Sequence, residues 1–415
     1  MSTSALSMPG YSRERLFLAS CLALLVTAMT FAVRADIMDA LGLRFTLNKE
    51  QVGAVAGIAF LGFTASIFFG GQVVDALGMG RVLALAFVCH AAGIVLTVLA
   101  WSYWSLWTGT LLIGMGNGLI EAAVNPLVTT MYADKKTHRL NSLHAYFPGG
   151  IVVGGLLAYG LTTLHLGWQV KMAMIGLPLI VYGLLFLGQT YPATERVQSR
   201  VTTGEMYREA LRPLFLVWLF CMLLTASTEL ATGQWIGSIL QNVAGASSIL
   251  VLVLINAIMF VGRSFAGQFV HKISPVGLLI GSSIFSLLGL LAMSYAQSKV
   301  GVFAAAAVFA VGVCYYWPTM LGVTSERFPR GGSFLLALMG AAGMFSVAIV
   351  LPLMGHVQDV SKAHPELALR YVAALPAILI VIFSAVYLGD KARGGYRPES
   401  LLTRVPDEEP LATPY

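Results

Sequence analysis

The stretch SLWTGTLLIGMGNGLIEAAVNPLVTTMY (residues 105–132) carries a single charged side chain, Glu121, in an otherwise uncharged run. About 20 apolar residues are enough for a helix to cross the hydrocarbon core of a bilayer. A carboxylate at the centre of such a helix costs roughly 2.5–3.5 kcal/mol on insertion scales, and acids in this position usually face protein or water. The run therefore predicts a membrane-spanning helix with a functional acid near its middle.

Polar residues recur along one side of the same run. Asn117, Glu121, Asn125 and Thr129 are spaced four residues apart, which places them along one face of a helix. A polar face on an apolar helix indicates that this face lines a wet path. A carboxyl group in this setting can bind and release a proton near neutral pH. The alternative is a structural acid that is neutral or paired with a distant Arg.

The composition is that of an integral membrane protein. Of the 415 residues, 57% are hydrophobic and only 11% are charged, whereas soluble domains have about 25% charged residues. The net charge of +6 does not indicate a nucleic-acid partner, because membrane proteins collect Lys and Arg in cytoplasmic loops. All four cysteines lie in apolar segments, which argues against disulfides and against a Cys-based metal site.

Twelve apolar runs are long enough to span a membrane. We predict spans near residues 16–41, 51–74, 81–100, 105–132, 142–164, 170–189, 213–240, 247–270, 276–296, 300–324, 332–355 and 368–389. They divide six and six around the longest internal polar segment. The sequence thus predicts an all-α integral membrane protein with two pseudo-symmetric six-helix halves (1–190 and 213–390), a cytoplasmic central loop (191–212) and a cytoplasmic tail (391–415).

The distribution of Lys and Arg favours a cytoplasmic location for both termini. We expect the plasma membrane, as in a bacterial inner membrane. The halves also repeat weakly: Asn125-Pro126 in the fourth span and Trp317-Pro318 in the tenth are each followed within eight residues by charged residues. Repeats of this kind place a binding site between the halves near the midplane.

One loop carries a recognisable signature. GQVVDALGMGR (71–81) is similar to Gly-x-x-x-Asp-x-x-Gly-Arg-Lys/Arg: Gly71, Asp75 and Gly78 match, and Arg81 falls two residues late. Together with the twelve spans, the loop resembles the major facilitator superfamily. This resemblance covers nearly the whole chain, and it implies transport by alternating access between two six-helix halves.

Three shorter stretches resemble the fucose–glucose–galactose:proton symporter family. They are GNGLIEAAVNP (116–126), RLNSLHAYFPGG (139–150) and TELATGQW (228–235). The resemblance implies that Asp36 in the first span and Glu121 in the fourth are the proton-coupling carboxylates. Pro148 stands where the family has Gly, and Arg34 precedes Asp36 where the family has a neutral residue. From the residues alone, Asp36 could equally be an acid in an extracellular loop.

The candidate substrate ligands combine amides, acids and aromatic rings. A hydroxyl-rich ligand needs donors and acceptors, together with an aromatic ring against its C–H face. These residues are Asn117, Glu121, Asn125, Glu229, Gln234, Trp235, Asn256, Tyr315 and Tyr316. For Glu229 the alternative is an acid at a helix end. For the two tyrosines it is packing or an interfacial belt.

A second group of residues is expected to gate the path or to shape the helices. Its members are Asp75, Arg81, Asn141, His144, Arg263, Pro126 and Pro318. Asp75 and Arg263 are expected to stabilise the cytoplasmic ends of helices, and the prolines are expected to bend theirs. His144 titrates near neutrality, so a proton relay and a gate or packing role near the cytoplasmic end both stay open.

These patterns predict a secondary active transporter that moves a small polar solute, a monosaccharide, by proton-coupled alternating access. The expected partners are the solute, protons and the lipid bilayer, with the chain acting as a monomer. No enzymatic activity, cofactor, metal or nucleic-acid partner is expected. The alternatives are proton-driven efflux of drugs or metabolites and a non-transporting membrane receptor.

Overall fold

The computed structural model describes residues 11–47, 49–233, 235–236, 239, 248–265, 273–361, 363–399 and 401. Every regular element in this part of the chain is a helix. The first bundle contains α1 (Arg13–Phe45), α2 (Lys49–Leu77), α3 (Met79–Val98), α4 (Tyr103–Met131), α5 (Lys136–Thr163), α6 (Trp168–Ala173) and α7 (Gly176–Phe186).

The second bundle follows two short helices, α8 (Glu195–Gln198) and α9 (Thr203–Glu209). It contains α10 (Pro213–Ala226), the π-helical turn η1 (Ser227–Ala231), α12 (Ser248–Ser264), α14 (Pro275–Tyr295), α15 (Lys299–Val313), α16 (Tyr316–Arg327), the 3-10 turn η2 (Pro329–Gly331), α17 (Gly332–Val360), α18 (Leu367–Val372) and α19 (Ala374–Ala392).

Among the described residues, eleven helical segments are long and apolar enough to cross a membrane, and a shorter apolar helix covers Val251–Ser264. In this count α6 and α7 form one segment, as do α15 with α16 and α18 with α19. The predicted fold class, an all-α membrane protein with twelve spans in two halves, is confirmed.

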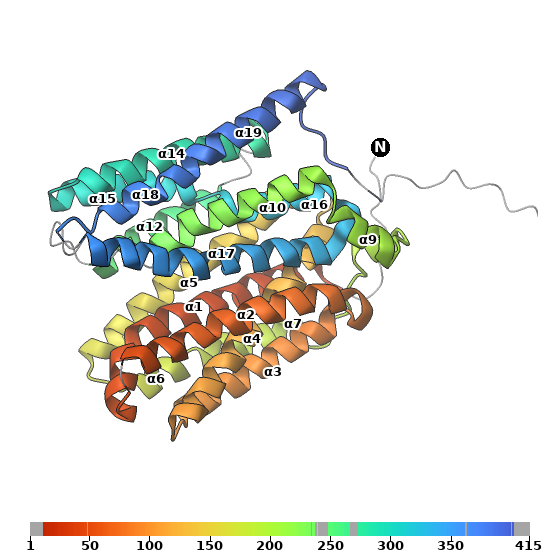
Figure 1. The fold of residues 1–415 in the computed structure, drawn as a ribbon. Coiled ribbons are helices and arrows are strands. Elements are labelled where there is room, and N and C mark those ends of the chain that lie inside the picture. The colour runs from red at the N-terminus through yellow and green to blue at the C-terminus, as the bar shows by residue number, and fades with distance from the viewer. Residues whose placement is uncertain are drawn as a thin grey trace, which may run out of the picture.

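The two bundles lie side by side with their helices roughly parallel (Figure 1). They meet where α2 packs against α17 and where α5 packs against α12 and α16. The helix α9 lies at one end of both bundles (Figure 1), and α8 and α9 both pack against η2. We call this end the linker face and the other end the opposite face.

Small residues allow neighbouring helices to approach closely. A Cβ atom on Gly114 of α4 would lie 2.2 Å from the Ala59 carbonyl oxygen on α2. A Cβ atom on Gly312 of α15 would lie 2.2 Å from the Ser286 nitrogen on α14. Small residues at such crossings are typical of membrane helices, whose association depends on close packing.

The prolines affect their helices in different ways. α4 continues through Pro126 without interruption. The tenth predicted span is divided, because α15 ends at Val313 and α16 begins at Tyr316. Pro318 has no N–H to donate to the carbonyl of Cys314 four residues earlier, so a break at this point follows from its chemistry.

Candidate functional site

Glu121 lies in a buried cluster of three side chains from α4 and α5. Asn125 Nδ2 donates to Glu121 Oε2 at 2.7 Å, and His144 Nε2 lies 2.9 Å from Asn125 Oδ1. An amide oxygen can only accept, so His144 Nε2 carries the hydrogen. The His144 ring is 3.9 Å from Glu121 Oε2. All three residues are buried, as expected for a polar site inside an apolar bundle.

Arg263 of α12 makes three hydrogen bonds from the second bundle. Its Nη2 donates to Glu229 Oε1 at 2.7 Å, its Nε donates to the Cys314 carbonyl at 2.6 Å, and its Nη1 donates to the His144 carbonyl at 3.1 Å. Glu229 lies on the π-helical turn η1. The bond to His144 crosses from the second bundle to the first.

Prolines explain why these two carbonyls are free to accept. In an α-helix, each carbonyl accepts from the N–H four residues later. The residue four positions after His144 is Pro148, and the residue four positions after Cys314 is Pro318. Neither proline has an N–H, so Arg263 supplies the missing donor at both places.

We call Glu121, Asn125, His144, Glu229 and Arg263 the central network. It joins α4 and α5 of the first bundle to η1 and α12 of the second. His144 and Arg263, which were expected near the cytoplasmic helix ends, are both buried, and Arg263 is the residue before the last of α12. Glu229 Oε2 is buried without a hydrogen-bond partner, which leaves one acceptor available to a ligand or a proton.

Asn117 belongs to a different network inside the first bundle. His90 of α3 lies 2.8 Å from Asn117 Oδ1 and 2.9 Å from the Tyr182 hydroxyl of α7. Asn117 Nδ2 donates to Thr30 Oγ1 of α1 at 3.1 Å. A Cβ atom on Gly116 would lie 2.3 Å from the His90 ring. We call His90, Asn117, Tyr182 and Thr30 the inner network; it holds four helices of one bundle together.

The remaining ligand candidates are spread along the second bundle. Tyr315 donates to the Gly262 carbonyl at 3.0 Å, and Asn256 donates within its own helix to the Leu252 carbonyl at 2.9 Å. Tyr316 is fully buried, and Trp235 is half-buried. Gln234 lies outside the described residues.

Asp36 lies apart from the central network. Lys171 of α6 donates to Asp36 Oδ2 at 2.6 Å and to Thr162 Oγ1 at 2.7 Å. The partner of Asp36 is therefore Lys171 and not the nearby Arg34. The side chain of Asp36 is 32% exposed. The two carboxylates that the sequence resemblance paired in function are thus separated in space.

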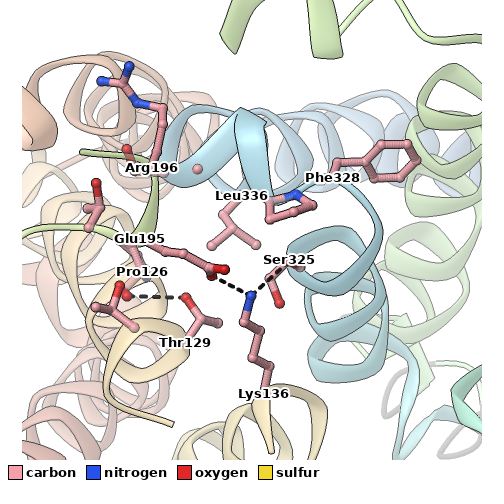
Figure 2. Close-up of a pocket in the computed structure, with 13 residues that line it drawn as sticks. Pro126, Thr129, Lys136, Glu195, Arg196, Ser325, Phe328 and Leu336 are labelled. Carbon is pink, nitrogen blue, oxygen red and sulfur yellow. Dashed lines mark hydrogen bonds and ion pairs between the residues drawn. The ribbon is translucent and has the colours of Figure 1, made fainter. Parts of the chain in front are cut away.

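The linker face is closed by an ion pair that reaches three parts of the chain. Lys136 at the start of α5 donates to Glu195 Oε2 of α8 at 2.5 Å and to the Ser325 carbonyl of α16 at 3.2 Å. Figure 2 shows Lys136 pointing between Glu195 and Ser325, with Pro126 and Thr129 of α4 beside them. The cavity here has a volume of about 20 Å³, room for about one water molecule.

A second acid closes the same face. Glu326 Oε1 accepts from the Thr137 nitrogen at 3.1 Å and from its hydroxyl at 2.6 Å. Tyr396 donates to Glu326 Oε2 at 2.5 Å. Burial raises the pKa of the Tyr396 hydroxyl well above its usual range, so the group remains a hydrogen-bond donor. These bonds tie α5 of the first bundle to α16 of the second.

The signature acid Asp75 contacts the linker and not Arg81. Arg196 Nε donates to Asp75 Oδ2, and Thr194 Oγ1 donates to Asp75 Oδ1, both at 2.7 Å. Arg81 is exposed on α3. Asn141 Nδ2 donates to Thr319 Oγ1 across the two bundles at 3.2 Å. Asp75 and Asn141 thus both make contacts that hold the linker face shut.

Four residues of the linker face were not predicted from the sequence: Lys136, Glu195, Arg196 and Glu326. A signal was present, because Lys136 and Glu326 follow the repeated Asn125-Pro126 and Trp317-Pro318 pairs. Charged residues at matching ends of two repeats are candidates for a gate between the repeats. Among the described residues, no three His, Cys, Asp or Glu side chains gather as a metal site would require.

Comparison with known proteins agrees with this architecture. The transporter FucP in its outward conformation superimposes with a TM-score of 0.74 at 16% identity, covering 89% of this chain and 97% of that chain. The proton:xylose symporter XylE superimposes with a TM-score of 0.73 at 16% identity, covering 90% and 95%. At these identities the likeness shows a shared fold.

Sequence relatives point to the same group of proteins. A 3-(3-hydroxy-phenyl)propionate transporter of Escherichia coli (strain K12) is 27% identical over 320 residues, which is 73% of this chain and 78% of the relative. A protein of Bacillus subtilis (strain 168), named as a niacin/nicotinamide transporter, is 22% identical over 189 residues, so the match spans about half of that relative (46%). The sequence pattern of the Major Facilitator Superfamily matches residues 16–349. The chain belongs to the major facilitator superfamily of membrane transporters.

Proposed function

We propose that this protein carries a small polar solute, a monosaccharide being the leading candidate, and that protons drive the transport. The central network is the observation that supports the proposal. It places two buried acids, Glu121 and Glu229, on opposite bundles with Arg263 bonded to one of them. A carboxyl group in the interior of a membrane protein costs free energy, and the acids that occur there usually have a function.

In this proposal, Glu121 binds and releases the coupling proton. The ionised form keeps a negative charge beside Asn125 and His144, whereas the protonated form removes that charge from the path. Arg263 balances Glu229 in either case, since the two are bonded at 2.7 Å. Protonation of Glu121 therefore changes the net charge between the halves, and that change favours closure around the solute.

The moving parts would be the halves 1–190 and 213–390, with 191–212 as the cytoplasmic connection and 391–415 as a cytoplasmic tail. The linker face is then the cytoplasmic side of a plasma membrane, such as a bacterial inner membrane. The bonds of Lys136, Glu326 and Asp75 close that side. The likeness to FucP in its outward conformation supports a state open to the other side.

Several similar proteins are named for solutes that contain a ring, although one sequence relative is named for triacylglyceride. Sequence relatives are named for niacin/nicotinamide, 3-(3-hydroxy-phenyl)propionate and myo-inositol. Proteins of similar fold are named for fucose and xylose. Amides and acids near the path, such as Asn125 and Glu229, suit a solute with several hydroxyl groups.

The test is uptake into proteoliposomes of a panel of hexoses, 6-deoxyhexoses and polyols, each with and without an inward proton gradient. We expect at least one compound to accumulate only when the gradient is present. If no compound in the panel is carried, the sugar assignment fails. If uptake ignores the gradient, the coupling assignment fails.

The variant Glu121→Gln keeps the size of the side chain and removes its proton chemistry. We expect it to abolish gradient-driven accumulation while exchange of solute across the membrane continues. Glu14→Gln is the matched control, because Glu14 is an exposed acid at the start of α1. Accumulation that survives in Glu121→Gln would remove Glu121 from the coupling role.

A further inference from the structure

Arg34 is a buried cation that no described residue neutralises. It lies on α1 with 5% of its surface exposed, and its Nη2 atom is buried without a hydrogen-bond partner. The nearest acid in sequence, Asp36, is bonded to Lys171 instead. Arg34 differs in this respect from Arg263, Arg196 and Lys136, each of which is paired with an acid.

One aromatic ring lies beside Arg34, and two further rings lie beside that one. Its guanidinium carbon lies 5.4 Å from the centre of the Phe31 ring. Phe31 in turn lies 5.2 Å from Phe60 of α2 and 6.1 Å from Phe147 of α5, measured between ring centres. Phe31, Phe60 and Phe147 are each only partly buried. The cation therefore sits beside a group of rings that still have open surface.

The rings next to Phe31 come from α2 and α5, two helices that border the second bundle. α2 packs against α17 and α5 packs against α12, so these two helices form the contact between the bundles. Phe31 of α1 lies against one ring from each of these two helices, and Arg34 is one turn from Phe31 on the same face. We therefore take this side of α1 as a wall of the proposed path between the halves.

The inner network fixes the depth of Arg34 along the path. Thr30 and Asn117 are hydrogen-bonded and lie at the same level. Arg34 is one helical turn from Thr30 toward the opposite face, and Glu121 is one turn from Asn117 toward the linker face. One turn is about 5–6 Å, so Arg34 lies roughly 10–12 Å beyond Glu121. A solute that enters from the opposite face reaches Arg34 first.

The chemistry of the guanidinium selects the ligand. A buried charge without a partner is unfavourable. A ligand of opposite charge would remove this cost when it binds. The planar guanidinium matches a carboxylate through two parallel hydrogen bonds. The neighbouring rings can stack on an aromatic ring or on the C–H face of a sugar ring.

We propose that Arg34 binds the carboxylate of the transported solute, which makes the substrate a small ring compound that carries a carboxylate group. The inference rests on the proposed transport of a small solute through the path between the halves, and it deepens that proposal by giving the solute a charge. A sugar acid and an aromatic acid share this chemistry, and the experiment distinguishes them.

The experiment measures binding and uptake for two matched pairs, glucuronate with glucose and 3-phenylpropionate with 3-phenylpropanol. In the unmodified protein we expect one of the acids to be taken up and to bind at least 10-fold more tightly than its neutral partner, about 1.4 kcal/mol. Arg34→Gln should weaken binding of that acid about 10- to 100-fold, the loss expected when a hydrogen-bonded charge pair is removed. Arg34→Lys should recover part of the affinity.

Arg44→Gln is the matched control. Arg44 lies on the same helix beside Phe45, at 5.9 Å from its ring centre, and it is exposed. Its replacement should leave binding of the acid unchanged. The melting temperature of ligand-free Arg34→Gln should equal or exceed that of the unmodified protein, because no ion pair is lost. A clear fall in that temperature would assign Arg34 a structural role and overturn the proposal.

The outcomes separate this inference from the proposed function. Gradient-driven uptake of neutral sugars, with no binding of either acid, would keep the proposed function and overturn the role of Arg34. If an acid is taken up, and its uptake depends on Arg34 but not on the proton gradient, the role of Arg34 is supported and the proposed proton coupling is overturned. Equal affinity of Arg34→Gln and the unmodified protein for the acid would also overturn the role of Arg34.

Discussion

The central network and the inner network lie one helical turn apart on α4, at Glu121 and Asn117. The inner network joins α1, α3, α4 and α7 of one bundle through neutral groups. The central network contains two acids and an arginine, and it crosses between the bundles. The same helix thus anchors one half of the molecule through Asn117 and faces the other half through Glu121.

The difference follows from the requirements of each position. A neutral network with paired donors and acceptors holds helices in one arrangement, because breaking any of its hydrogen bonds leaves a buried polar group unpaired. A charged network between two bodies can change when a proton or a solute binds. The comparison leads us to expect that changes in the inner network affect stability, whereas changes in the central network affect both stability and coupling.

The largest effect is expected from Arg263→Gln. The change leaves Glu229 buried without its cation and removes the donor from the carbonyls of His144 and Cys314. Breaking a buried ion pair by removing one partner costs about 3–5 kcal/mol. The free energy of unfolding in detergent, measured by denaturant titration, should fall by about this amount.

Adding Glu229→Gln to this variant tests the cause. Removing the unpaired acid should restore part of the lost stability. The effects of the two substitutions on the free energy of unfolding should therefore be strongly non-additive. If Arg263→Gln unfolds like the unmodified protein, the central network is not held together by Arg263.

The next effect is expected from Gly71→Val, which separates the bundles at the linker face. A Cβ atom on Gly71 of α2 would lie 2.0 Å from the Ala337 Cβ of α17, whereas carbon atoms in contact lie about 3.5–4.0 Å apart. The added side chain must therefore move α2 away from α17. This movement should disturb the central network and leave the inner network intact.

Two native cysteines report on the two networks. Cys314 bonds to Arg263 through its carbonyl, and Cys89 precedes His90 on α3. Thiol labelling followed by mass spectrometry should show faster modification of Cys314 in Gly71→Val and an unchanged rate for Cys89. Equal changes at both cysteines would indicate general loosening, and the distinction between the networks would fail.

A smaller effect is expected from His90→Phe. The variant leaves Asn117 Oδ1 and the Tyr182 hydroxyl without their partner, at a cost of about 1–3 kcal/mol for unsatisfied buried groups. The free energy of unfolding should fall, and the dependence of transport on the proton gradient should be unchanged. A change in proton coupling would show that the inner network also takes part in the cycle.

The smallest effect is expected from Asp36→Asn. The ion pair with Lys171 is partly exposed, and such pairs contribute about 0–1 kcal/mol. Lys171 also keeps its bond to Thr162. Gradient-driven accumulation should persist in this variant. Its loss would support Asp36 as the second coupling acid, as the sequence resemblance implies.

The fold was predictable because the signals are local. Apolar length defines the spans, and the polar segment near residues 191–213 marks the division between the halves. Glu121 and Asn125 were also found, since four-residue spacing places them on one face. These predictions needed no knowledge of which helices are neighbours.

The pairing of side chains across helices could not be predicted in this way. His144 and Arg263 lie near the ends of their predicted spans, and only the packing of α5 against α12 brings them together. Asp36 is close to Arg34 in sequence, but helix geometry turns it toward Lys171 on α6. Contacts between distant helices depend on rotation and depth, which periodicity does not specify.

The three bonds of Arg263 are unequal with respect to motion of the halves. The bonds to Glu229 and Cys314 lie within the second half, and only the bond to the His144 carbonyl crosses to the first. If the halves rock apart as proposed, the cation gives up one hydrogen bond to a carbonyl, worth about 1.5–3 kcal/mol for a charged donor, and keeps its acid. Opening at this point would then cost one hydrogen bond and not an ion pair, because the charge of Arg263 is balanced within its own half.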